Sequence, residues 1–212
     1  MKKVGFVSLG CPKNLVDSEV MMGQLAASGY EITNDAGEAD TVVVNTCGFI
    51  EAAKQESVDA ILEAMRWKTE GKANRVIVAG CLVERYRDDL MKELPDVDAF
   101  IGTSQVGDIL KAADETFDAA ELTISPIGNK SATYLYDEYT PRMRATDAHT
   151  AFIKIAEGCD RPCAFCSIPG MRGSFRSRRF GSIIEEARML AADGVKELVL
   201  IAQDSSRYGE DL

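Results

Sequence analysis

The sequence has no long apolar run and almost no histidine. No stretch approaches the ~18 apolar residues that a membrane-spanning helix needs, so we expect no membrane segment. The first six residues carry two lysines but no extended apolar stretch and no small-residue cleavage site, so they do not resemble a signal peptide. Repeats and low-complexity tracts are also absent. We therefore expect a soluble, cytoplasmic globular protein.

The scarcity of histidine leaves cysteine as the main candidate metal ligand. His149 is the only histidine, whereas the chain has six cysteines. In a protein without a secretion signal, such cysteines indicate metal or redox use in a reducing compartment, and not a disulfide framework.

Three of the cysteines stand close together, as Cys159, Cys163 and Cys166. This Cys-x3-Cys-x2-Cys spacing lets one short loop wrap three thiolates around a cubane iron–sulfur cluster, which normally takes four cysteine ligands. Because the run holds no fourth cysteine, one iron stays open to bind something other than protein. The alternatives are a zinc loop, which usually closes with a fourth Cys or His, and a disulfide pair.

Strand and helix patterns alternate over the first 115 residues. Short apolar runs predict buried parallel strands, at 4–9, 41–45, 75–79 and 99–102. Helical spacing predicts helices between them, at 15–27, 51–67, 83–94 and 106–113, the second with Val58, Ile61, Leu62 and Met65 on one face. This alternation implies an α/β fold, a parallel sheet covered by helices on both faces.

The alternation stops near Phe117, and a second unit begins near residue 138. Its expected elements are a strand at 151–155, the cysteine loop, a helix at 182–192 and a strand at 197–201. We therefore predict a first domain at 1–117, a connector at 118–137 and a second domain at 138–212. The second domain contains only one and a half β/α units.

Positive charge is scarce in the N-terminal part. Residues 1–140 hold 13 Lys and Arg against 24 Asp and Glu, whereas residues 141–212 hold 11 against 10. An acidic region argues against a nucleic-acid platform there. It would suit a basic protein partner, or serve only as a solvated surface.

The remaining cysteines, Cys11, Cys47 and Cys81, each follow a predicted strand. Because the strands of a parallel sheet point one way, we expect the three thiols at one carboxyl edge, where open α/β sheets place their ligand sites. With neighbouring strands roughly 4.8 Å apart, they would gather around a second three-thiolate cluster. The alternative is three separate small buried residues, since free cysteine is often buried.

The loop around Cys166, with the aromatic Phe165 just before it, resembles the signature of radical S-adenosylmethionine enzymes. The N-terminal half resembles the methylthiotransferases, which add a second cluster domain to that chemistry. The resemblance lies in the stretches 8–14, 45–50 and 79–81. The start Gly-Cys-Pro-Lys-Asn, followed by Val-Asp-Ser-Glu, is most similar to the branch that modifies an aspartate of the twelfth small-subunit ribosomal protein. The branch acting on an adenosine of transfer RNA more often reads Gly-Cys-Gln-x-Asn.

The resemblance implies two 4Fe–4S clusters and S-adenosylmethionine as cofactors, with an electron donor such as flavodoxin or ferredoxin. The cluster that cleaves S-adenosylmethionine would be held by the second triplet along the chain, Cys159, Cys163 and Cys166. An auxiliary cluster that delivers sulfur would be held by the first triplet, Cys11, Cys47 and Cys81. The methylthio group would go to the β-carbon of the aspartate. Such an unactivated carbon–hydrogen bond has no acid–base route at neutral pH, so the cofactor must supply the chemistry.

The resemblance also implies cofactor contacts for Phe165, through its backbone, and for Gln203, at a strand end. Packing and strand capping are the alternatives. Arg176 belongs to a basic run with Arg172, Arg178 and Arg179, for which we expect either cofactor or substrate contacts or, more often, a solvated loop. Two asparagines beside the first triplet, Asn14 and Asn45, would hydrogen-bond cluster sulfurs or cap turns.

Enzymes of this kind have a partial (β/α) barrel of about six units and a small substrate-binding β-barrel, so the resemblance implies that the chain contains only the beginning of the first barrel. We expect an N-terminal fragment that is incomplete for turnover. Two other functions stay open. A transfer-RNA methylthiotransferase would have stronger basic patches, and a non-enzymatic iron–sulfur carrier would not cleave S-adenosylmethionine.

Overall fold

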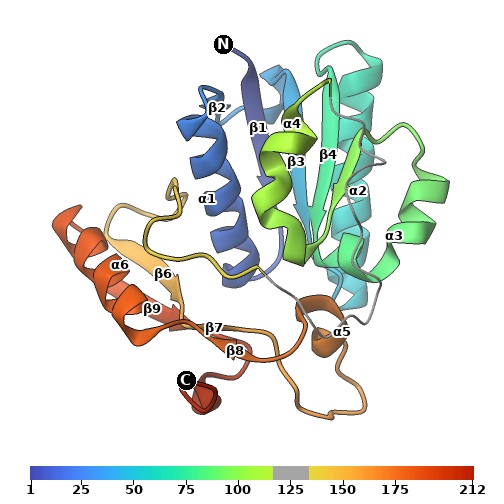
Figure 1. The fold of residues 1–212 in the computed structure, drawn as a ribbon. Helices are drawn as coiled ribbons and strands as arrows, with labels where there is room; N and C mark the ends of the chain where they lie inside the picture. The colour runs from blue at the N-terminus through green and yellow to red at the C-terminus, as the bar shows by residue number, and fades with distance from the viewer. Residues whose placement is uncertain (117–133) are drawn as a thin grey trace.

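The computed structural model describes residues 1–116 and 134–212 and contains a large parallel sheet and a smaller second part (Figure 1). The sheet has the order β2-β1-β3-β4-β5, with every pair parallel. Its strands are β1 (Lys3–Ser8), β2 (Glu31–Thr33), β3 (Thr41–Thr46), β4 (Arg75–Gly80) and β5 (Ala99–Ile101). The predicted α/β class is confirmed.

Helices cover both faces of this sheet and bury two apolar clusters. They are α1 (Pro12–Ala27), η1 (Ala36–Glu38), α2 (Glu51–Thr69), α3 (Cys81–Glu93), η2 (Thr103–Asp108) and α4 (Ile109–Ala113). Val43 and Ile77 pack with α1 and α4, whereas Val42 and Val76 pack with α2 and α3 on the other face. Every residue of β3 and β4 is buried, as the nearly continuous apolar runs predict. Burial of each such Val or Ile stabilises the fold by roughly 1.5–3 kcal/mol.

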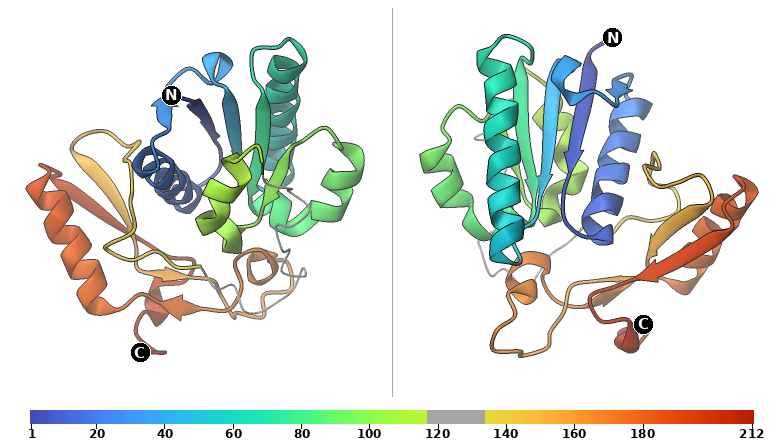
Figure 2. Two further views of the ribbon diagram at one scale, coloured as in Figure 1. Left: turned by 45° about the horizontal axis from the view of Figure 1, so that its top comes forward. Right: turned by 180° about the vertical axis from the view of Figure 1, so that it is seen from behind.

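The second part lies beside α1 (Figure 2). Its strands are β6 (Thr150–Lys154), β7 (Ala156–Glu157), β8 (Arg176–Ser177) and β9 (Glu197–Ile201), and its helices are α5 (Ile168–Arg172), α6 (Phe180–Ala192) and η4 (Ser205–Arg207). β6 and β9 pair in parallel, whereas β7 and β8 pair antiparallel. A third apolar cluster, which includes Ile153 and Leu190, packs α6 on β6.

The structure differs from the sequence predictions in several details. The short strand β2 and the helix α5 were not predicted, because three and five residues are too few for a periodic pattern. The helix predicted at 106–113 is split between η2 and α4. Leu62 does not share the buried face of α2, since it is 46% exposed while Ala64 is fully buried.

The predicted connector falls mostly outside the described residues. Of its residues 118–137, only 134–137 are described, and they form neither helix nor strand. The division into domains at 1–117 and 138–212 therefore stays a prediction. Within the described ranges, no helix is both long and apolar enough to cross a bilayer.

Candidate functional site

The first cysteine triplet lies at the carboxyl edge of three neighbouring strands. Cys11 precedes α1 just beyond β1, Cys47 follows β3, and Cys81 begins α3 directly after β4. The order β1-β3-β4 places these three loops next to one another in space. The expected gathering at one edge is therefore present in the fold.

Two glycines allow the cysteine loops to touch. Gly10 has φ +91°, and a Cβ there would stand 2.9 Å from the Cβ of Cys47. Gly80 has φ +98°, and a Cβ there would stand 2.6 Å from the carbonyl oxygen of Thr46. Both backbones occupy a region that only glycine enters without strain. The sequence thus brings the loops into direct contact at the strand ends.

The three thiols of the first triplet differ in exposure. Cys11 is exposed, Cys47 is half-buried and Cys81 is buried. Burial raises the pKa of the Cys81 thiol to about 11, against the opposing charge of Arg172. Because a metal ligand must be a thiolate, binding at Cys81 would release a proton into this buried setting.

The second triplet lies in the loop between β7 and α5, below the carboxyl ends of the large sheet (Figure 1). Cys159 is buried, and its amide donates to the carbonyl of Gly173 at 3.0 Å. Cys166 is half-buried, and its amide donates to the carbonyl of the exposed Cys163 at 3.0 Å. The three cysteines of this loop thus differ in exposure, as those of the first triplet do.

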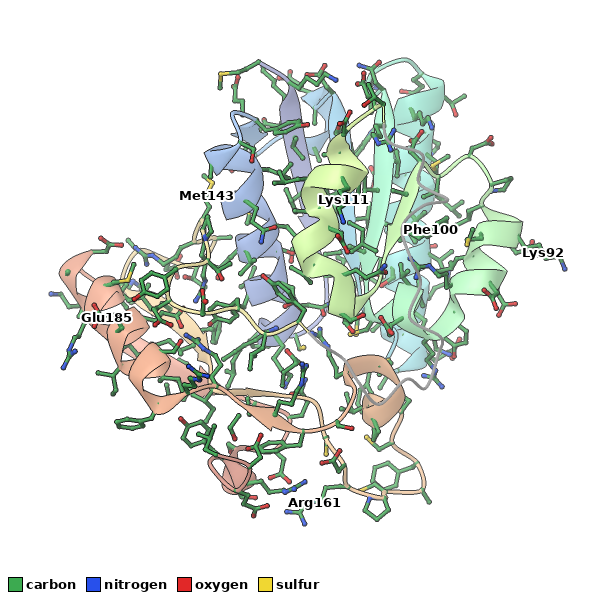
Figure 3. The ribbon with its side chains drawn as sticks, in the orientation of Figure 1. Lys92, Phe100, Lys111, Met143, Arg161 and Glu185 are labelled. Carbon is green, nitrogen blue, oxygen red and sulfur yellow. The ribbon has the colours of Figure 1, made fainter. Side chains whose placement is uncertain are left out.

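The outer end of this loop is open to solvent. The Phe165 side chain is 91% exposed, so it makes no packing contact in the core. Arg161 lies at the rim of the molecule (Figure 3), and its Nε donates to Asp204 at 2.8 Å. The packing alternative for Phe165 is therefore wrong.

The donor set of both triplets consists of thiols, which are the protein ligands of iron–sulfur clusters. All six cysteines are free thiols. In residues 1–116 and 134–212, no three His, Cys, Asp or Glu side chains converge closely enough to hold one ion. Ligation by the two triplets stays a prediction.

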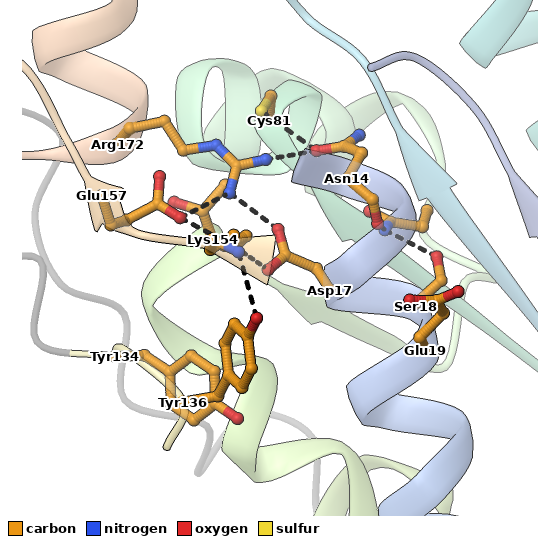
Figure 4. Close-up of polar contacts among 12 residues, drawn as sticks. Asn14, Asp17, Ser18, Glu19, Cys81, Tyr134, Tyr136, Lys154, Glu157 and Arg172 are labelled. Atoms are coloured by element: carbon orange, nitrogen blue, oxygen red, sulfur yellow. Dashed lines mark hydrogen bonds and ion pairs between the residues drawn. The ribbon is translucent and has the colours of Figure 1, made fainter. Parts of the chain in front are cut away.

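Between the triplets lies a buried ionic quartet, which we define as Asp17, Lys154, Glu157 and Arg172 (Figure 4). Lys154 donates to Asp17 and, at 2.7 Å, to Glu157. Arg172 donates to the second carboxylate oxygen of Asp17 at 2.7 Å and lies 3.6 Å from Glu157. Two cations and two carboxylates balance, so the cluster has no net charge.

Charge pairing within the quartet opposes the effect of burial on the pKa of Glu157 and of Lys154. Burial alone would raise the pKa of Glu157, but Lys154 and Arg172 overcome it and hold that pKa at about 2. Burial alone would likewise lower the pKa of Lys154, but the carboxylates of Asp17 and Glu157 raise it above its ordinary value. Glu157 and Lys154 are therefore both charged near neutral pH.

A second ionic quartet, which we define as Glu19, Arg142, Arg178 and Glu186, joins α1 to α6. Arg142 bonds Glu19 at 2.5 Å and Glu186 at 2.6 Å, and Arg178 bonds Glu186 at 2.5 Å. Arg178 also lies 4.3 Å from the ring centre of Tyr136, as in a cation–π contact. This quartet too is neutral as a whole.

These contacts correct the solvated-loop interpretation of the basic run. Arg172 and Arg178 are 3% and 2% exposed and bind carboxylates. Arg176 is half-buried, and only Arg179 is exposed. The run is basic because it supplies the cations that buried carboxylates require.

Gln203 and Arg176 gather around Glu157, two residues before Cys159. The Gln203 amide nitrogen donates to Glu157 at 2.6 Å, and Arg176 is paired opposite Glu157 across the β7–β8 ladder. Within the described residues, the Gln203 Oε1 and the Arg176 Nε are buried without a hydrogen-bond partner. Leaving a buried polar atom without a hydrogen-bond partner is costly.

Sequence reasoning missed Asp17, Lys154 and Glu157 as parts of this site. The signal for one of them was present, because Lys154 interrupts the apolar run Ala151–Ile155. Lysine is almost never fully buried unless it is paired. The partners themselves come from distant elements and leave no local pattern.

Comparison with known proteins identifies relatives of the whole chain. Residues 3–102 match the uncharacterized protein family UPF0004. The chain is 55% identical over 210 residues to the ribosomal protein uS12 methylthiotransferase RimO of Solibacter usitatus, covering 99% of this chain and 43% of that protein. It is 51% identical over 249 residues to the protein of the same name from Koribacter versatilis, covering 100% of this chain and 49% of that protein.

The fold also resembles a solved structure. The radical S-adenosylmethionine methyltransferase TsrM of Kitasatospora setae superposes with a TM-score of 0.59 at 14% sequence identity, over 96% of this chain and 48% of that one. At this identity the likeness concerns the fold alone. The chain spans about half the length of the curated relatives it matches, 43% and 49% of the first two. Along its whole length, the chain is similar to proteins that bear the name ribosomal protein uS12 methylthiotransferase.

Proposed function

We propose that this protein adds a methylthio group to the β-carbon of an aspartate in the ribosomal protein uS12. One observation carries the proposal. Two separate triplets of free cysteines lie at the carboxyl end of the large sheet, and a short chain of buried contacts joins them. Arg172, which follows the second triplet, contacts Asn14, and Asn14 contacts Cys81 of the first triplet.

In this proposal, each triplet holds one 4Fe–4S cluster and leaves one iron free of protein ligands. The clusters and S-adenosylmethionine, when bound, supply the radical and sulfur chemistry that side chains lack. Cys159, Cys163 and Cys166 would ligate the cluster beside the cofactor. Cys11, Cys47 and Cys81 would ligate the auxiliary cluster.

The residues around Glu157 would bind the cofactor. The orphaned Gln203 Oε1 can accept a hydrogen bond from an amino group, and the Arg176 Nε can donate one to a carboxylate. The exposed loop at Phe165 would reach the adenine through its backbone. The free thiols agree with a reducing, cytoplasmic setting.

A protein substrate is favoured over transfer RNA. Residues 1–140 carry 13 Lys and Arg against 24 Asp and Glu, and such an acidic balance repels phosphate. The relatives from Solibacter usitatus and Koribacter versatilis both bear the name of uS12 methylthiotransferases. Both facts argue for a basic protein partner.

The test is the iron and acid-labile sulfide content after anaerobic reconstitution. We expect about eight irons per chain, falling to about four in a Cys159→Ala/Cys163→Ala/Cys166→Ala variant. The reconstituted protein should cleave S-adenosylmethionine when reduced, and the variant should not. A result of about four irons that are lost completely in the variant would remove the sulfur-insertion function. Two clusters without any cleavage would instead favour an iron–sulfur carrier.

A further inference from the structure

Asn14, in the first turn of α1, contacts the loops of all three cysteines of the first triplet. Its side chain is 1% exposed. The amide nitrogen donates to the carbonyl of Leu9 at 3.1 Å and to the carbonyl of Thr46 at 2.7 Å. The amide oxygen lies 3.5 Å from the sulfur of Cys81. Leu9 stands two residues before Cys11, and Thr46 directly precedes the second cysteine of the triplet.

The orientation of this amide is determined by its partners. Both carbonyls can only accept hydrogen bonds, so the NH2 group must face them. The guanidinium of Arg172, which can only donate, contacts the oxygen on the other side. A flipped amide would place donor against donor and acceptor against acceptor, so only one arrangement satisfies the site.

Arg172 reaches this amide from the second part of the protein. It ends α5, the helix that follows Cys166, and it is 3% exposed. One guanidinium nitrogen donates to Asp17 at 2.7 Å while another donates to Asn14. The two acceptors lie on the same face of α1, one turn apart, which matches the forked geometry of arginine.

The backbone of the same helical turn is held from a third direction. Asn45, at the end of β3, donates to the main-chain oxygen of Asn14 at 2.8 Å and to the Ser18 hydroxyl at 2.9 Å. The Asn14 side chain therefore has neither a free donor nor freedom to turn. A residue that only caps a helix or completes a turn would not need contacts with three loops and with the second part of the protein.

We propose that Asn14 is the positioning residue of the first cysteine triplet. Arg172, at the end of α5 in the second part of the protein, holds the Asn14 amide in place. The Asn14 amide then sets the spacing of the three loops, and a shift of α5 is transmitted through it to Cys81. This proposal rests on the proposed function, because its readout is a cluster bound by the first triplet.

The test uses the chain in which Cys159, Cys163 and Cys166 are all replaced by alanine, so that only the first site can bind a cluster. Into this parent we would introduce Asn14→Asp, which keeps the shape and the oxygen toward Arg172 but removes both N–H donors. Asn74→Asp, at an exposed asparagine before β4, is the matched control. Iron and sulfide per chain and the electron paramagnetic resonance spectrum of the reduced cluster are measured, with circular dichroism to check folding.

We expect at least a twofold loss of iron, with an altered spectrum, in Asn14→Asp and parental values in Asn74→Asp. A second variant, Arg172→Lys, keeps the charge but cannot span both acceptors. Arg172→Lys should change the spectrum of the cluster at the first triplet, although Arg172 lies in the second part of the protein. Arg188→Lys, on the surface of α6, should leave that spectrum unchanged.

The outcomes separate the two proposals. A parent that binds no cluster overturns the proposed function and the positioning role with it. A parent with a normal cluster, and Asn14→Asp and Arg172→Lys variants with the parental iron content and spectrum, overturns the positioning role alone. That last result would mean that the contacts of Asn14 serve folding only, whatever the change in stability.

Discussion

The two cysteine triplets are supported by different kinds of structure. The first follows β1, β3 and β4, and all residues of β3 and β4 are buried. The second follows β7, a strand of two residues, and extends into a loop whose Phe165 is 91% exposed. A site at the edge of a packed sheet is held by the core, whereas a site on a loop keeps freedom to adapt to a ligand.

The loop of the second triplet is anchored by charged residues at both of its ends. Lys154 and Glu157 stand before it and Arg172 stands after it, and all three belong to the ionic quartet with Asp17. Ion pairs in a dry interior are specific but fragile, because loss of one partner leaves a buried charge uncompensated. The comparison therefore predicts that the two sites fail in different ways.

The largest effect is expected from removing one cation of the quartet. Lys154→Met leaves Asp17 and Glu157 with a single arginine, so the free energy of unfolding should fall by about 3–5 kcal/mol. Urea titration followed by circular dichroism measures the change. Arg188→Met removes an exposed pair with Glu185 and should cost no more than ~0.5 kcal/mol. Equal effects of the two variants would show that the quartet does not stabilise the fold.

The second-largest effect is expected from acid, which should weaken the quartet. The carboxyl of Glu157 has a pKa of about 2 in the folded protein, below its ordinary value of 4.5. Its ionised form therefore stabilises the fold above about pH 4.5, and this contribution is lost as the pH falls toward 2. The shift corresponds to a contribution on the order of 3 kcal/mol.

The measurement is the free energy of unfolding between pH 7 and pH 3, for the natural chain and for Glu157→Gln. The natural chain should lose stability more steeply with acid, so that the two curves approach each other at low pH. Parallel curves would mean that Glu157 does not titrate with the predicted pKa.

Two glycine substitutions test how tightly the two cysteine sites are packed. Gly80 has φ +98° and close backbone neighbours beside the first triplet, so Gly80→Ala should destabilise the protein by roughly 1–3 kcal/mol. Gly170, in α5 beside the second triplet, has no neighbour within 4 Å of the position that an added methyl group would take. Gly170→Ala should therefore be neutral or stabilise by up to ~1 kcal/mol. Thermal unfolding of both variants tests this difference, which would disappear if the sites were equally packed.

The smallest effect is expected at Phe165. Since its side chain is 91% exposed, Phe165→Ala should change the free energy of unfolding by less than ~0.5 kcal/mol. Phe100→Ala, at an 8% exposed phenylalanine of β5, is the matched comparison and should cost about 3–5 kcal/mol. A large loss at Phe165 would show that its loop packs against the protein after all.

Much of the fold was predictable because its signals are local. The runs at 41–45 and 75–79 are apolar and β-branched, and they form the two fully buried central strands. The cysteines after those strands were predicted at one edge, because parallel strands share a direction. The short elements β2 and α5 were missed, because three and five residues of pattern do not distinguish strand, helix and turn.

By itself, the sequence determined the α/β alternation, the two cysteine spacings and the placement of one triplet at strand ends, since each depends on neighbours in the chain. Only the tertiary structure decided the partners of the charged residues. Asp17 and Arg172, or Glu19 and Arg142, are far apart in sequence and meet only when α1 packs against the second part. A charged side chain carries no sign of its partner, because ion pairing depends on distance in space and on the exclusion of water.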